Sequence, residues 1–196
     1  LRLAGDSGPN GASQAATWTG TQSGGTINIY KGGGSEIGFG LGGNGNVSGS
    51  ATYTLSGTGI LNDIGTSGNG TFCLGADSTG NYTTTFNLEG GKLLVSGTAT
   101  NAGGSDISGY TVGAKQVFNW TGGTLVCGSY VAANLISPAG GSTGTLVNGG
   151  GTLAPGDVGS SGKTFITGNY SVNSPSASLA IDLGGTTASS VFQDAA

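Results

Sequence analysis

The chain has 196 residues, of which 44 are glycine; five Lys plus Arg stand against nine Asp plus Glu, and there is no histidine. Five basic residues are too few to neutralise a run of phosphates, so nucleic-acid binding is not expected. No apolar stretch approaches the roughly 18 residues of a membrane-spanning helix, and a helical repeat would not tolerate so many glycines.

Glycine pairs followed by a strand-like start recur along the chain at nearly fixed intervals. The first glycines of the copies are 33, 33, 32, 28 and 34 residues apart. They are Gly24, Gly57, Gly90, Gly122, Gly150 and, in a looser copy, Gly184. Self-similarity at a period of about 20–50 residues is typical of repeat folds, in which each unit buries its apolar face against its neighbours. The periodic glycines are therefore expected at turns that need positive φ.

Each unit is predicted to contain three short strands, recognised by apolar residues at i and i+2. The copies of the first strand contain Phe39 and Leu41, then Phe72 and Leu74, then Tyr110 and Val112. In the second strand, one interior column is predicted to contain Tyr53, Phe86 and Phe118, and the next Leu55, Leu88 and Trp120. The third strand follows the glycines and contains Leu93 in one unit and Leu125 in the next.

These strands predict a single all-β domain over residues 1–196, a right-handed parallel β-solenoid of about six coils with roughly 33 residues each. Residues one coil apart would lie about 4.7–4.9 Å from each other and form ladders. A β-sandwich with turns every 8–12 residues stays open as an alternative. It gives no reason, however, for like residues to recur at a spacing of 33.

Several stretches also resemble a known family. GNGNVSGSATYTLSGTGIL, GADSTGNYTTTFNLEGGKLLV and above all GGTLAPGD at Gly150 to Asp157 are similar to bacterial secreted proteins with autotransporter-associated β-strand repeats. The resemblance covers roughly Ile37 to Thr187. It implies an exported β-solenoid that is extracellular or displayed at the cell surface. The chain starts at Leu1 without Met or a signal peptide, so a mature or excised product is expected.

Catalytic chemistry is not expected. Without histidine, the usual Ser-His and Cys-His arrangements and most zinc sites are excluded. A β-helical lyase or hydrolase would need carboxylates clustered on one face, but Asp77, Glu89 and Asp106 fall on different units, and Asp63 is aligned with Ser96. The turn at Asp77 offers oxygens to Ca²⁺ but lacks a calcium-binding repeat. No cofactor and no metal are therefore predicted.

The cysteines and threonines give two further expectations. Cys73 lies between inward-facing Phe72 and Leu74 and is expected to point outward, whereas Cys127 is expected to point inward. Their spacing of 54 residues is not a whole number of coils, so two free thiols are predicted. The sequence TxT occurs at 52–54, 83–85 and 98–100, positions that do not align, so a flat threonine lattice is not expected.

The ends of the chain indicate how it would assemble. Leu1 and Leu3 begin the chain, and SLAIDL near the other end contains Leu179, Ile181 and Leu183. Uncovered sheet edges pair with other chains, so head-to-tail stacking of the protein with itself is predicted. The expected function is a structural subunit of an extracellular fibre, sheath or matrix, with adhesion to surface glycans as an added role. A carbohydrate-binding or carbohydrate-degrading module and a passive stalk of a larger surface protein are the alternatives.

Overall fold

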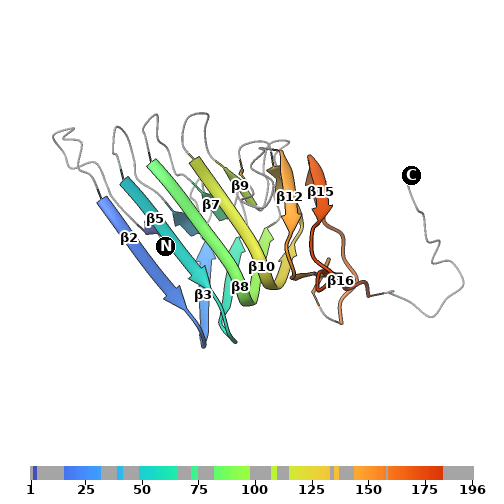
Figure 1. Cartoon of the computed structure of the whole chain (residues 1–196). Coiled ribbons are helices and arrows are strands. Elements are labelled where there is room, and N and C mark those ends of the chain that lie inside the picture. The colour runs from blue at the N-terminus through green and yellow to red at the C-terminus, as the bar shows by residue number, and fades with distance from the viewer. Residues whose placement is uncertain are drawn as a thin grey trace, which may run out of the picture.

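A computed structural model describes residues 2–3, 16–31, 39–41, 49–65, 72–74, 82–97, 107–109, 115–132, 135–136, 144–157 and 159–182. Within these ranges the chain is built of strands without an α-helix, and each ladder between neighbouring strands is parallel. Strands from successive passes of the chain lie side by side (Figure 1). The all-β prediction is therefore confirmed.

The strands form three parallel sheets. The six-stranded sheet has the order β1 (Arg2–Leu3), β4 (Phe39–Leu41), β7 (Phe72–Leu74), β9 (Ile107–Gly109), β11 (Ser129–Val131) and β14 (Phe165–Thr167). The main path of the eight-stranded sheet runs β16 (Ser178–Leu179), β13 (Thr152–Leu153), β10 (Lys115–Cys127), β8 (Tyr82–Gly97), β5 (Gly49–Leu55) and β2 (Ala16–Gln22). In that same sheet β3 (Thr26–Lys31) pairs with β6 (Ile60–Gly65), and β6 pairs with β8. The third sheet pairs β12 (Thr145–Asn148) with β15 (Asn169–Val172).

The long strands β8 and β10 each bend at a corner, so that the eight-stranded sheet continues from one face of the molecule to another. The first part of β8 pairs with β5 and the last part with β6, so β8 belongs to two faces of the molecule. Glycines make the turn between the faces: φ is 66° at Gly91 and 70° at Gly123. A Cβ at Gly123 would also lie 2.6 Å from the carbonyl oxygen of Gly90 in the preceding pass. Corners can therefore stack only if they have no side chain at this position.

One corner is a residue longer than the others, and this changes the alignment that follows it. Four positions separate Leu88 from Lys92, whereas five separate Leu55 from Ile60, although Leu55 pairs with Leu88 and Ile60 with Lys92. The alignment of Asp63 with Ser96 was consequently wrong. Asp63 pairs with Val95.

The interior is filled by columns of like residues. We call Trp18, Tyr53, Phe86 and Phe118 the aromatic ladder. Tyr53 pairs with Phe86 and Phe86 with Phe118, and the ring centroids are 5.5 and 5.8 Å apart with nearly parallel planes. Trp18 stacks on Tyr53 at 6.1 Å. Such stacked rings add to the free energy of burial.

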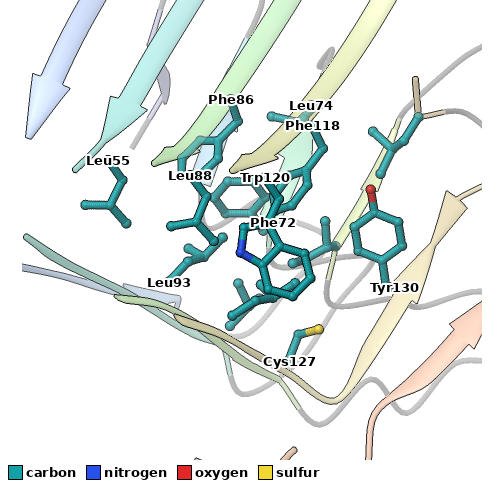
Figure 2. Packing of buried hydrophobic residues seen from close by; sticks show 14 of the residues in the cluster. Leu55, Phe72, Leu74, Phe86, Leu88, Leu93, Phe118, Trp120, Cys127 and Tyr130 are labelled. Atoms are coloured by element: carbon teal, nitrogen blue, oxygen red, sulfur yellow. The ribbon is translucent and has the colours of Figure 1, made fainter. Parts of the chain in front are cut away.

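A second and a third column accompany the aromatic ladder. Leu55 pairs with Leu88 and Leu88 with Trp120. The third column contains Ile27, Leu61, Leu93, Leu125, Leu153 and Leu179. Figure 2 shows Leu55, Leu88, Trp120 and Leu93 of these columns packed in the core, together with Phe72 and Tyr130 from the six-stranded sheet. A spacing of 33 and 32 residues predicted the pairings of Leu55, Leu88 and Trp120, because the strands of this column carry no insertion.

The third copy of the first strand was predicted at the wrong place. Ile107, not Tyr110, pairs with Phe72 and is fully buried. Tyr110 and Val112 lie outside the described residues. Ile107 fits because the core needs a bulky apolar side chain next to Phe72 in the following pass. The prediction failed because the connection before this strand varies in length from pass to pass.

Candidate functional site

The carboxylates of the described residues do not form a cluster. Asp63 is fully buried on β6, whereas Glu89 is exposed at the corner of β8. Asp157 pairs with Lys92, and Asp182 accepts a hydrogen bond from the backbone N–H of Gly159. No group of three or more metal-ligating side chains is present in the described ranges. Asp77 and Asp106 lie outside them.

The ion pair between Lys92 and Asp157 fastens the GGTLAPGD segment to the outer side of β8. Both side chains are partly exposed, with 29% and 27% of their surfaces accessible. Asp157 adopts φ 73°, in the left-handed region that Asp tolerates better than most residues. The pair is thus a structural contact between passes, with the modest stabilisation typical of exposed ion pairs.

Amide side chains flank the column of Leu55, Leu88 and Trp120 on both sides. Gln22 precedes Leu55 in that column; it donates to the carbonyl of Ile60 and accepts a hydrogen bond from the Tyr53 hydroxyl at 2.8 Å. At the other side Asn148 is fully buried and accepts hydrogen bonds from the N–H groups of Gly150 and Gly151. Polar groups therefore lie on both sides of the apolar part of this column, and half-exposed Val172 follows Asn148 on the outermost strand.

The C-terminal strands leave interior positions uncovered. We call Tyr170, Val172, Leu179 and Ile181 the open end. Tyr170 pairs with buried Leu146, Val172 with buried Asn148, and Leu179 with buried Leu153. The exposed fraction rises from at most 5% in the inner partners to 38%, 56% and 52% in the outer ones, and Ile181 is 52% exposed.

These outermost strands also end their sheets. β14, β15 and β16 each come last in the strand order of the described residues. Sequence reasoning had placed Leu179 and Ile181 at an assembly end, but missed Tyr170 and Val172, although they alternate with Ser171 as the residues of a strand do. Leu3 lies in β1 and pairs with Leu41. Leu1 and Leu183 fall outside the described residues.

The outer side of β2, β5 and β8 carries an array of hydroxyl groups. Thr19 pairs with Thr52 and Thr52 with Thr85. The TxT copies at 52–54 and 83–85 are out of register as expected, but the conclusion that no threonine lattice forms was wrong. The same pairings align Thr17 with Ser50 and Thr83, and Thr21 with Thr54 and Asn87. The TxT motif concealed this array, because the motif shifts by two residues between β5 and β8.

Two tyrosine side chains, Tyr53 and Tyr130, are buried in the core. Burial, and less strongly the neighbouring Cys127, raises the pKa of Tyr130 above its ordinary value. Burial likewise raises the pKa of Tyr53. Cys73 and Cys127 are free and buried, so the thiol of Cys73 is not presented to solvent even though it was expected to point outward. Two alkylatable thiols after denaturation remain the expected count.

No helix in the described part of the chain is long and apolar enough to span a membrane. No protein-family model, curated protein or solved structure matches the chain. The resemblance to proteins with autotransporter-associated repeats therefore remains a prediction from the sequence motifs.

Proposed function

We propose that the chain is a right-handed β-solenoid of about six coils that stacks end to end into an extracellular structural fibre. The observation that supports it best is the open end. Among the described residues, the columns that contain Leu146 and Leu153 end at half-exposed Tyr170 and Leu179. They do not end there at a polar cap of the kind that soluble repeat proteins use.

A second copy of the chain fits this end in two ways. It would continue the columns that stop at Val172 and Leu179, and its edge strand would pair with the outer backbone groups of β14, β15 and β16. Neither Tyr170, Val172, Leu179 nor Ile181 carries a charge, so no like-charge repulsion opposes the contact. Because the two ends of a coil stack differ, the contact is head to tail and propagates as a filament.

The test of this proposal is a charge placed in the open end. Leu179→Asp should shorten or abolish filaments seen by negative-stain microscopy and light scattering, because a buried unpaired carboxylate is costly. In the monomer the same change should be mild, since Leu179 is 52% exposed. Ser160→Asp adds the same charge on an exposed turn and should leave assembly intact.

The assembly proposal is wrong if the wild-type protein stays monomeric at high concentration. It is also wrong if filaments of Leu179→Asp equal those of the wild type. Unfolding by urea, followed on dilute samples of both variants, separates a loss of assembly from a loss of folding.

We also propose that the protein is not an enzyme, which is supported by the separation of Asp63, Glu89, Asp157 and Asp182. A general acid and base must lie within reach of one substrate bond, but Asp63 is buried and Asp157 is paired with Lys92. Incubation with pectin, alginate, xylan and glucans, with and without Ca²⁺, should give no turnover. Turnover that is lost on Glu89→Ala would contradict this.

A further inference from the structure

The hydroxyl array is a regular two-dimensional pattern on one face of the molecule. Its nine positions lie on three adjacent strands, three to a strand, and are Thr17, Thr19, Thr21, Ser50, Thr52, Thr54, Thr83, Thr85 and Asn87. Eight of these nine side chains carry a hydroxyl group, so the pattern is nearly uniform. Strand pairing sets the repeat at about 4.8 Å across the strands and about 6.6 Å along them.

The array faces solvent and carries no charge. Thr17, Thr19 and Thr21 are exposed on the edge strand β2, and Ser50, Thr52, Thr54, Thr83, Thr85 and Asn87 are partly exposed on β5 and β8. A side chain on the outer face in the middle of a sheet is only partly exposed, because side chains on the neighbouring strands reduce its contact with solvent. Figure 1 shows β2, β5 and β8 lying side by side.

The positions of the hydroxyl groups are held firmly. Threonine is β-branched and has few χ1 rotamers on a strand. Trp18, Tyr53 and Phe86 alternate with these hydroxyl residues on the same strands and belong to the aromatic ladder, whose rings stack at 5.5–6.1 Å. Asn87 donates from Nδ2 to the Thr54 hydroxyl at 3.1 Å, which fixes the one amide of the pattern.

We infer that this face binds ice, by ordering a layer of water that joins the surface of the crystal. Rigid, evenly spaced hydroxyl groups form hydrogen bonds with water molecules and so fix the positions of the water oxygens. The threonine methyl groups between them form no hydrogen bonds, so water above the methyl groups bonds to other water molecules. A charged face would orient water around ions instead, and the nine positions contain no charge.

A polysaccharide is the less suitable occupant. Sugar rings are usually held by exposed aromatic side chains that stack on their faces. The aromatic side chains described on these strands, Trp18, Tyr53 and Phe86, belong to the interior ladder. The inference concerns a side of the molecule other than the open end, so it does not depend on assembly.

Thr52 is the centre of the array, which makes it the residue to change. The wild-type protein should shape growing ice crystals, depress their growth temperature and slow recrystallisation. Thr52→Tyr should abolish these effects, because a ring standing on the array prevents the face from meeting a flat crystal surface. Thr26→Tyr is the matched control, an exposed threonine on β3 outside the array, and should behave as the wild type.

Three results would overturn the inference. The first is a folded wild-type protein, checked by circular dichroism, that leaves ice crystals round. The second is equal loss of activity in Thr26→Tyr and Thr52→Tyr. The third is co-sedimentation of the wild type with crystalline cellulose or chitin, lost in Thr52→Tyr, without any effect on ice.

Discussion

Gly20 stands at the position where the aromatic ladder would otherwise continue beyond Tyr53. It has no side chain, and the indole of Trp18, two residues earlier, occupies the space above it. A ladder residue is thus supplied from a neighbouring position on the same strand. Spacing alone could not predict this, because Trp18 pairs with Ala51 and not with Tyr53.

Replacing Gly20 by alanine should therefore destabilise the protein, because the new Cβ would overlap the Trp18 ring. Overpacking of this kind costs about 1–3 kcal/mol of unfolding free energy. Urea unfolding followed by tryptophan fluorescence measures it. Gly24→Ala is the control, since its Cβ would meet only Thr58 Oγ1 at 3.7 Å. Equal stability of the two variants would mean that Trp18 does not occupy this place.

Tyr130 makes stability depend on alkaline pH. Its pKa is raised by burial in the folded state, so the folded protein keeps a proton that the unfolded chain releases above about pH 10. The stabilisation from this buried neutral phenol is therefore fully present below pH 10. Above pH 10 the free energy of unfolding falls, by up to about 1.4 kcal/mol per pH unit.

Urea unfolding between pH 9 and pH 11 should therefore show a smaller loss of stability in Tyr130→Phe than in the wild type. Tyr30→Phe, which removes a phenol that is 74% exposed, is the control and should follow the wild type. Parallel pH profiles for all three proteins would contradict the effect of burial.

At the scale of the elements, the corners decide which glycines are indispensable. Gly25 and Gly123 share the same left-handed backbone, with φ 67° and 70°. A Cβ at Gly25 would have nothing within 4 Å, whereas one at Gly123 would meet backbone atoms of the previous pass. Comparing an alanine at each position therefore distinguishes the cost of backbone strain, present at both, from the cost of close packing, present only at Gly123.

Gly25→Ala should cost about 1–2 kcal/mol, the usual penalty of left-handed backbone for a residue with a Cβ. Gly123→Ala should cost clearly more, because the stacked corners must also move apart. Thermal and urea unfolding of both variants measure the difference. A Gly123→Ala protein that is no less stable than Gly25→Ala would show that the corners are not closely packed.

How far the sequence predicts these elements depends on where the chain varies in length. Tyr53, Phe86 and Phe118 could be aligned because their strands carry no insertion. Ile107 and the partner of Asp63 could not, because the extra residues lie in connections and in one corner. The array around Thr52 was missed since only the pairing of strands, and not a short motif, relates Thr19 to Thr85.

At the scale of the whole molecule, each pass of the chain contacts only the neighbouring passes. Local stability is therefore expected to differ between the middle of the molecule and its ends. Central strands have a neighbour on both sides, whereas β14, β15 and β16 have one and carry exposed apolar side chains. In a repeat protein the end units open first.

Native-state hydrogen exchange of the monomer should therefore be fastest in β14–β16 and slowest in β8 and the middle of β10. If the open end binds a second copy, protection of β16 should rise with protein concentration while that of β8 stays constant. Uniform exchange along the chain would contradict both expectations.

The alternation of Thr52, Tyr53 and Thr54 along β5 limits how the sequence can change over evolutionary time. Because side chains alternate, a single-residue deletion within β5 would turn the ring to the solvent and the hydroxyl groups into the core. Substitutions at the two sides can be accepted independently, but insertions and deletions cannot. Length changes should therefore accumulate in the connections and corners, as the extra residue between Leu55 and Ile60 already illustrates.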